Sequence, residues 1–357
     1  MIQPRPHVAA LSVYGLASLD IPAGMQLVSL AQNESPFPPS PLAFEAARKT
    51  AAEGALYPDP SCMALRTAIG EVQGLDPADI ICSAGSMEII AALIAAFSGP
   101  DDEVLSSAHA YSYFKTAAMA VGASPVAADE VDLTVSVDHL IEAVTPATRI
   151  VCIANPGNPS GTRISGAEVR RLRDELPSDV ILLVDEAYAE FGPDDPVFDL
   201  VGRGDTCITR TFSKAYALAG MRVGWGLFPR SIGDEVWKLL NPGGVSATSL
   251  AAAAAAMRDQ AYMQELVSKT VALRDPFIAR MNALGLTIAP SHTNFALIQL
   301  PSVEAATSAD AALRSEGVVM RPMGGYGLPH CLRVTVGLQQ EMDFAHDILR
   351  QWTESNA

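Results

Sequence analysis

Short apolar runs alternate with helical stretches through the middle of the chain. The runs are continuous rather than alternating between apolar and polar positions, and they are EVLSSA (103–108), RIVCIANP (149–156), VILLVDEAY (180–188), TCITRTF (206–212) and VGWGLF (223–228). Continuous apolar runs are typical of strands that are buried on both faces, as in a parallel sheet covered by helices. The pattern therefore predicts an α/β fold whose large domain has three α/β/α layers around a mainly parallel sheet.

The two ends of the chain have a different pattern. The first forty residues are rich in proline and irregular, and helical patterning begins only with PLAFEAARKTAAEG (41–54). Near the C-terminus, TNFALIQL, ADAALRSEG, VVMRP, CLRVTVG and MDFAHDILRQW follow one another as in a compact α+β unit. We therefore predict an N-terminal arm over 1–28, a large domain over 42–265, and a small C-terminal domain that joins 29–41 to 266–357.

Charge and cysteine content narrow the class of protein. The net charge of −16 disfavours nucleic-acid binding and docking on anionic membranes, because both need a basic surface. The five cysteines form no CxxC pair, so neither a metal site nor a redox dithiol is expected. The first residues lack a signal-peptide pattern, and the longest apolar runs are too short to span a bilayer. We expect a reduced, cytoplasmic protein.

Polar residues gather where the predicted strands end. In open α/β sheets, ligands bind beyond the carboxyl ends of the strands. Four such ends are SAGSM (83–87), ANPGNPSGT (154–162), DEAY (185–188) and TFSKA (211–215). They offer a turn of small residues at a helix start, an amide, a carboxylate beside a phenol, and a lysine. The sequence therefore places a candidate site at this edge of the sheet.

The residue types at these ends match one cofactor. The turn at 83–86 suits a phosphate or a simple helix cap, and Ser213 and Arg222 could add donors to the same phosphate. Asp185 suits either an N-cap or a carboxylate opposite a protonated ring nitrogen. Lys214 lies at a partly desolvated strand end, where its pKa falls and a neutral amine can form a Schiff base. Together these features indicate pyridoxal 5′-phosphate.

Six stretches carry a family resemblance from about residue 29 onward. They are NESPFPPSP, YPDPSCMALRTAI, NPGNPSGT, VDEAYAEF, RTFSKAYALAGMRVGW and CLRVTVG, in family order. The chain resembles the fold-type I pyridoxal-phosphate aminotransferases of class I and II, and most closely the histidinol-phosphate aminotransferase family. The resemblance implies a homodimer with shared active sites at the subunit interface. Fingerprints of dinucleotide-binding, P-loop, zinc-protease and α/β-hydrolase enzymes are absent.

The resemblance implies catalytic roles for three residues. Lys214 would be the Schiff-base lysine, Asp185 would pair with the pyridine nitrogen, and Tyr188, with Asn158, would hydrogen-bond the ring hydroxyl. The other positions implied for cofactor binding are Tyr111 on the ring face, Gly85, Ser86, Met87, Ser213 and Arg222 at the phosphate, and Tyr57, reaching the phosphate of the neighbouring subunit's cofactor. By residue type alone, Tyr57 and Tyr111 are also compatible with core aromatics.

Three further residues are implied in substrate binding. Arg333, in CLRVTVG, would pair bidentately with the α-carboxylate of the substrate. Arg321 matches a family position that binds the distal part of the substrate, although an arginine on an edge strand is equally often solvated. Asn33, in NESPFPPSP, is the third residue implied in substrate binding.

The implied reaction is transamination. An amino donor, either histidinol phosphate or an aromatic amino acid, would pass its amino group to a 2-oxo acid such as 2-oxoglutarate, by ping-pong kinetics via pyridoxamine phosphate. Decarboxylation of a phospho-amino acid stays open, because enzymes similar to threonine-phosphate decarboxylases share these motifs. Departures from the family at Met87, at His109–Ala110 and in NPGGVSATS (241–249) leave the donor open as well.

Overall fold

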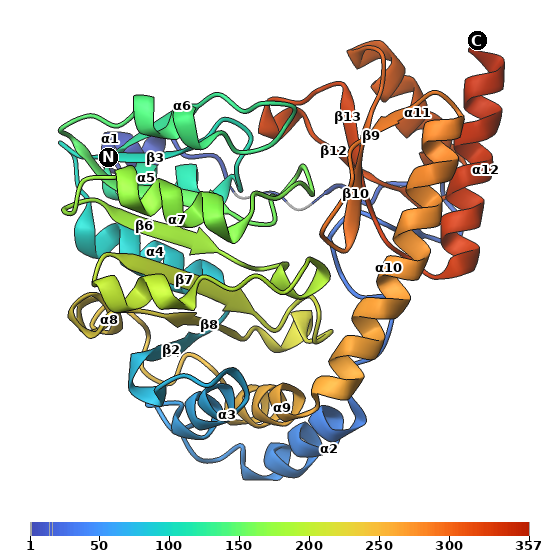
Figure 1. The fold of residues 1–357 in the computed structure, drawn as a ribbon. Helices are drawn as coiled ribbons and strands as arrows, with labels where there is room; N and C mark the ends of the chain where they lie inside the picture. Colours follow the sequence, from blue (N-terminus) through green and yellow to red (C-terminus); the bar gives the residue numbers. More distant parts are fainter. Residues whose placement is uncertain (1, 14, 16, 357) are drawn as a thin grey trace.

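The computed structural model describes residues 2–13, 15 and 17–356, so residues 1, 14 and 16 of the predicted arm and residue 357 of the predicted small domain lie outside the description. A seven-stranded sheet forms the centre (Figure 1), in the order β2-β8-β7-β6-β5-β3-β4. The bounds are β2 (Ile80–Ser83), β3 (Glu103–Ser107), β4 (Ser124–Ala128), β5 (Thr148–Ala154), β6 (Ile181–Asp185), β7 (Thr206–Thr211) and β8 (Gly224–Leu227). Among the seven strands only β8 runs in the opposite direction to the others, so the prediction of a mainly parallel sheet is confirmed.

Helices cover both faces of this sheet. One apolar core holds residues of α2 (Pro41–Thr50), α3 (Met63–Gln73), α6 (Val137–Glu142), α7 (Gly166–Glu175) and α9 (Ala247–Arg258). The other holds residues of α4 (Ser86–Phe97), α5 (Tyr113–Val121) and α8 (Arg230–Trp237). Along β5, Ile150 and Cys152 enter the second core, whereas Val151 and Ile153 enter the first. Continuous apolar runs thus do mark strands buried on both faces, and the three-layer prediction is confirmed.

The edge strand β4 was not predicted. Its sequence is SPVAA, and most of its residues are exposed or half-buried. It pairs with β3 alone, so it does not need the apolar run that marks the inner strands. A prediction based on continuous apolar runs therefore misses an edge strand of this kind.

A second sheet and three helices form the C-terminal part of the fold (Figure 1). The four-stranded sheet has the order β12-β13-β10-β9, and a separate parallel pair joins β1 to β11. The bounds are β1 (Val28–Ser29), β9 (Thr287–Ile288), β10 (Phe295–Gln299), β11 (Val318–Val319), β12 (Arg321–Pro322), β13 (Cys331–Thr335), α10 (Gln260–Ala283), α11 (Val303–Ser315) and α12 (Gln339–Ser355). These elements, apart from β12, contribute residues to an apolar core of their own.

The long helix α10 connects the two parts of the fold. Figure 1 shows it running from beside α9 to the second sheet. The pairing of β1 with β11 brings the segment before α2 to the C-terminal elements. We therefore propose the domain division 1–28, 42–265, and 29–41 with 266–357, in which the last boundary falls inside α10. Near the N-terminus, the short helix α1 (Pro6–Ala9) lies in the arm and packs on α5.

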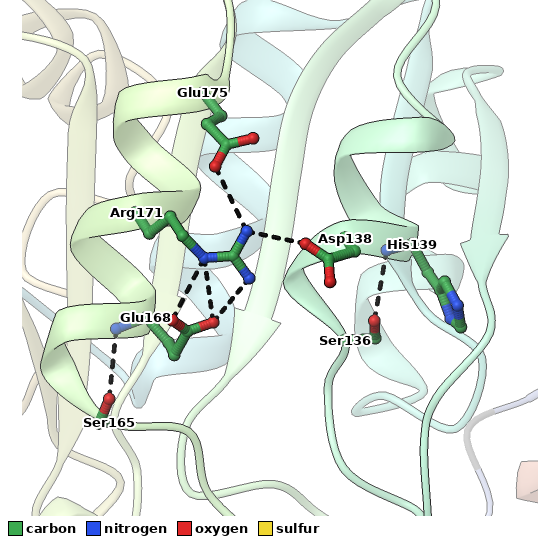
Figure 2. A network of polar contacts seen from close by, with 7 residues as sticks. All are labelled: Ser136, Asp138, His139, Ser165, Glu168, Arg171 and Glu175. Carbon is green, nitrogen blue, oxygen red and sulfur yellow. Dashed lines mark hydrogen bonds and ion pairs between the residues drawn. The ribbon is translucent and has the colours of Figure 1, made fainter.

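A polar contact at the surface joins α6 to α7. Figure 2 shows its residues, which are Ser136, Asp138 and His139 at α6, and Ser165, Glu168, Arg171 and Glu175 at α7. The serine of each set accepts an N–H from the first turn of its helix, as an N-cap does. The Arg171 guanidinium pairs with Asp138 across the two helices at 2.8 Å. Exposed ion pairs of this kind contribute at most about 1 kcal/mol to the stability of the fold. The contact between α6 and α7 is therefore a minor feature of the surface.

In the described part of the chain, every helix is too short or too polar to cross a lipid bilayer.

Candidate functional site

A cleft of about 450 Å³ opens where the central sheet meets the C-terminal sheet. From the large domain it is lined by residues that follow β2, β5, β6 and β7, as expected for an α/β sheet. The predicted residues that line it are Asn33, Ser86, Met87, Tyr111, Asn158, Asp185, Tyr188, Ser213, Lys214, Arg222, Arg321 and Arg333. The structure therefore brings together almost the whole set of predicted residues.

One end of the cleft is built for an anion. Gly85 is the N-cap of α4 and has a φ of +94°, which favours glycine. A Cβ at Gly85 would lie 2.5 Å from Nη2 of Arg222, so the missing side chain lets the guanidinium lie against the helix start. Nη1 of Arg222 lies 3.4 Å from the hydroxyl of Ser213. A helix N-terminus, a serine hydroxyl and a guanidinium together suit a phosphate.

Asp185 is the last residue of β6 and is 4% exposed. Its Oδ1 accepts a hydrogen bond from the hydroxyl of Thr209 at 2.8 Å. Burial raises the pKa of Asp185 to about 7, the Thr209 hydrogen bond opposes that rise, and the nearby Glu186 adds to it. A buried carboxylate is stabilised by a cationic partner, so the protonated nitrogen of a heterocycle fits this position.

Lys214 lies three residues beyond β7, and its Nζ donates to the backbone carbonyl of Asn33 at 2.9 Å. Burial lowers the pKa of Lys214 to about 7, with the charges of Arg333 and Arg222 adding to the effect and Glu34 opposing it. An amine with such a pKa is largely neutral just above neutral pH, and only the neutral amine is a nucleophile. The chemistry that the sequence indicated for Lys214 is thus supported by its surroundings.

Asn33 connects the two sides of the cleft. Its φ of +54° is unusual for a residue other than glycine. Its side-chain amide donates to the Tyr188 hydroxyl at 2.8 Å, and its own N–H donates to Thr335 of β13 at 2.8 Å. Asn294, just before β10, donates to the same Asn33 carbonyl that holds Lys214. Asn33 therefore orients both Lys214 and Tyr188.

Arg333 is 3% exposed and reaches the cleft from β13. Its Nη1 donates to Oδ1 of Asn158 at 2.6 Å, and its Nη2 donates to the carbonyl of Ala31 at 3.1 Å. These two hydrogen bonds fix the orientation of the Arg333 guanidinium at the wall of the cleft. Since Oδ1 of Asn158 already accepts a hydrogen bond from Arg333, its Nδ2 is the group left to donate to a ligand.

Three predicted residues lie at the margin of this arrangement. Tyr111 lines the cleft and packs edge-on against Phe114, with ring centroids 5.7 Å apart. Arg321 lies at the mouth, where its Nη2 donates to the carbonyl of Gly15 in the arm at 3.1 Å. Tyr57 is fully exposed and does not line this cleft, so within one chain it has no access to the site.

The sequence did not single out several residues of the site. Gln32, Glu34 and Tyr326 line the cleft, and Thr209 contacts Asp185 from the neighbouring strand. Thr209 could have been found from strand pairing, because it stands directly opposite Asp185 in the parallel register of β6 and β7. Tyr326 ends a short 3₁₀ turn (Gly324–Tyr326) in a glycine-rich segment, which carries no recognisable signal.

Comparisons with known proteins agree with this geometry. The family model described as aminotransferase class I and II matches residues 25–347. A histidinol-phosphate aminotransferase of Paramagnetospirillum magneticum is 42% identical over 355 residues, covering 98% of each chain. One of Ruegeria pomeroyi is 40% identical over 356 residues, covering 99% of each.

Solved structures of aminotransferases have a similar fold. The histidinol-phosphate aminotransferase of Sinorhizobium meliloti, in complex with pyridoxal-5′-phosphate, has a TM-score of 0.92 and 28% identity, covering 100% of this chain and 99% of that chain. A Thermus thermophilus aspartate aminotransferase double mutant has a TM-score of 0.87 at 20% identity, covering 99% and 100%, and shows a shared fold alone. The expected fold type is therefore confirmed.

Proposed function

The chain belongs to the aminotransferases of class I and II, and from that premise we propose that its amino donor is histidinol phosphate and its acceptor a 2-oxo acid such as 2-oxoglutarate. The observation that carries the proposal is the pair of arginines on the substrate side of the cleft, Arg333 and Arg321. Histidinol phosphate and an aromatic amino acid both carry an aromatic ring, and they differ in the anion next to the amine. A phosphate ester carries more negative charge than a single carboxylate and can pair with two guanidinium groups at once. The names of the curated relatives support the same donor.

The enzyme is a pyridoxal-phosphate-dependent aminotransferase, and the residues of the cleft fit that cofactor. When bound, pyridoxal phosphate supplies an aldehyde that combines with amines and a pyridine ring that takes up electrons released at the substrate Cα. Gly85, Ser86, Ser213 and Arg222 would hold its phosphate, and Met87, also in the cleft, would flank that group.

The remaining cofactor contacts fall to residues around the ring. Asp185 would pair with the ring nitrogen, and Tyr188 and Asn158 would donate to the ring hydroxyl. Tyr111 would cover the ring face, and Lys214 would bind the aldehyde carbon. Each of these side chains lines the cleft, so all could contact one ligand.

Lys214 also has the properties of the acid and base of the reaction. Once its amine is free, a pKa of about 7 lets it take a proton from the substrate Cα and release it again near neutral pH. The Asn33 carbonyl holds the amine at 2.9 Å and directs it into the cleft. Arg333 and Asn33 would bind the substrate, and Arg321 would contact its distal part. Decarboxylation gains no support, because the relatives named above are aminotransferases.

A panel of amino donors tests the proposed donor. We expect histidinol phosphate to convert the bound cofactor with a kcat/KM at least about 10²-fold above that of phenylalanine, because the single carboxylate of phenylalanine cannot pair fully with both arginines. The visible absorbance of the holoenzyme reports this step, and 2-oxoglutarate should restore the original spectrum. Faster conversion by phenylalanine would replace the proposed donor with an aromatic amino acid. Release of carbon dioxide without consumption of 2-oxoglutarate would contradict transamination.

We also propose that the enzyme is a homodimer with shared active sites. Five large apolar or aromatic side chains are exposed within 42–63, namely Leu42, Phe44, Leu56, Tyr57 and Met63. Such a concentration on one segment is typical of a surface that another chain covers. Tyr57, which lies outside the cleft of its own chain, would reach the cofactor phosphate of the partner.

Tyr57→Phe is expected to weaken cofactor binding about tenfold, because the lost phenol would donate to a phosphate oxygen. Equilibrium dialysis of the holoenzyme measures the change, and Tyr262→Phe, which loses an exposed hydroxyl bonded to the Pro38 carbonyl, is the matched control. A mixed dimer of one Tyr57→Phe chain and one Lys214→Ala chain should hold one site of wild-type affinity, since its Lys214 and its Tyr57 come from different chains. Weak binding at that site would show that Tyr57 acts within its own chain.

A reducing compartment such as the cytoplasm suits the cysteines. All five are free and buried, and burial raises the pKa of Cys62 and of Cys331 to about 11. Thiols of this kind stay protonated at neutral pH and react slowly. The protein thus relies on no disulfide for its fold, which supports the proposed cytoplasmic location.

A further inference from the structure

Asp185 is flanked by very different residues on its two neighbouring strands. In the parallel registers, Ala154 of β5 stands opposite it on one side and Thr209 of β7 on the other. Alanine offers the carboxylate no polar side-chain atom, whereas the Thr209 hydroxyl donates to Oδ1 at 2.8 Å. The backbone also ties the two strands here, since the N–H of Glu186 donates to the carbonyl of Thr209 at 2.8 Å.

We propose that Thr209 is a positioning residue, whose hydroxyl holds Oδ1 of Asp185 so that Oδ2 faces the cofactor's ring nitrogen. Thr209 is fully buried and does not line the cleft, so it acts through Asp185 and not on any ligand. Its β-branched side chain has few rotamers, which keeps the hydroxyl directed at the carboxylate. The proposal rests on the role of Asp185 given above and is independent of the identity of the amino donor.

The hydrogen bond from Thr209 to Asp185 matters because the carboxylate is buried among other titratable groups. The titratable groups around Asp185 are Cys152 of β5, Glu186 and Tyr188 beyond the end of β6, and Lys214 and Arg222 across the cleft. Without the cofactor, Asp185 has a pKa of about 7 and is therefore only partly ionised at neutral pH. Because the Thr209 hydrogen bond lowers that pKa, its loss would shift Asp185 further toward the neutral acid, which is a poorer partner for a ring cation.

The test measures cofactor affinity by equilibrium dialysis of the holoenzyme against pyridoxal phosphate. Thr209→Val keeps the shape but removes the donor, and we expect it to weaken binding about tenfold at pH 7, or about 1.4 kcal/mol. The deficit should shrink toward about pH 9, where Asp185 is ionised in both proteins. Thr209→Ser should restore the affinity to within about threefold of the wild type.

Two controls separate positioning from packing. Thr206→Val removes another fully buried hydroxyl from the same strand, one that donates to Asp205 and not to Asp185, and should leave the affinity unchanged. In an Asp185→Asn background, Thr209→Val should change the affinity less than about twofold, because the two residues act as one unit. Should Thr209→Val not fold, Thr209→Ala against Thr209→Ser makes the same comparison.

Three results would overturn the proposal. They are a Thr209→Val protein with wild-type affinity at pH 7, a serine variant as weak as the valine variant, and an undiminished valine effect in the Asp185→Asn background. If Asp185→Asn alone left cofactor affinity unchanged, the role of Asp185, and with it that of Thr209, would be wrong. None of these measurements involves an amino donor, so the donor proposal stands or falls separately.

Discussion

Lys214→Ala is expected to abolish both covalent attachment of the cofactor and turnover. The alanine leaves no amine at the position where Nζ now lies 2.9 Å from the Asn33 carbonyl, and it removes the proposed acid and base together. Loss of a residue with both roles should lower kcat by at least about 10⁴-fold. Borohydride reduction followed by intact-mass measurement checks attachment, and wild-type protein should gain the mass of one reduced cofactor per chain.

Two further variants sharpen this test. Lys214→Arg keeps the positive charge but stays protonated, so it should be as inactive as the alanine variant. Lys238→Ala removes an exposed lysine that is paired with Glu235 and should attach the cofactor normally. Attachment of the cofactor by Lys214→Ala after reduction, or full turnover, would exclude Lys214 from the role proposed here.

The lowered pKa of Lys214 predicts a pH dependence. Burial favours the neutral amine, so the nucleophilic form is mostly present above about pH 7 and not only above the 10.5 of an ordinary lysine. The rate at which cofactor-free protein attaches pyridoxal phosphate should therefore rise as the pH increases through about 7 and level off well below pH 10. Stopped-flow absorbance measures this rate. A rise that continues beyond pH 10 would contradict the lowered pKa.

The sequence was sufficient for the central sheet apart from its edge strand β4, and for the residues at the strand ends. Apolar runs such as the one that ends at Asp185 are buried on both faces, and burial is what the pattern reports. In a parallel sheet the strand ends gather at one edge, so Asp185, Asn158 and Lys214 could be placed together without coordinates.

Contacts between segments that are far apart in the chain could not be predicted from the sequence. Asn33 and Lys214 are 181 residues apart, and no spacing rule connects a backbone carbonyl in a proline-rich loop with a lysine after a strand. The same holds for Arg321 and the carbonyl of Gly15, 306 residues apart. Thr209 was passed over for another reason, since threonine is an ordinary strand residue and its role appears only with the register.

The arrangement of Asn33 bears on how the site works. Its carbonyl holds Lys214, its amide holds the Tyr188 hydroxyl, and its N–H is tied to Thr335 of β13. Arg333 lies on the same strand as Thr335 and contacts Asn158 of the large domain. A shift of β13 relative to the central sheet would therefore move groups on the proposed substrate side and on the proposed cofactor side of the cleft together.

Arg333→Lys is expected to lower kcat/KM for both half-reactions by about 10²- to 10³-fold, or about 3–4 kcal/mol. The guanidinium is 3% exposed and oriented by Asn158 and Ala31, and a lysine cannot offer two parallel N–H groups to a carboxylate or phosphate from that position. Single-turnover measurements with the amino donor and with 2-oxoglutarate check this loss. Arg350→Lys, a surface change on α12, should be without effect.

Arg333→Met, compared with Arg333→Lys, separates two proposed effects of Arg333, which are its effect on the pKa of Lys214 and its binding of the substrate. The positive charge of Arg333 lowers the pKa of Lys214, so its removal should raise that pKa and move the pH profile of cofactor attachment upward. Arg333→Lys keeps a positive charge and should leave the profile near that of the wild type while substrate binding is still lost. If the lysine variant bound substrate normally, a bidentate contact would not be needed. If the methionine variant left the pH profile unmoved, Arg333 would act on the substrate alone.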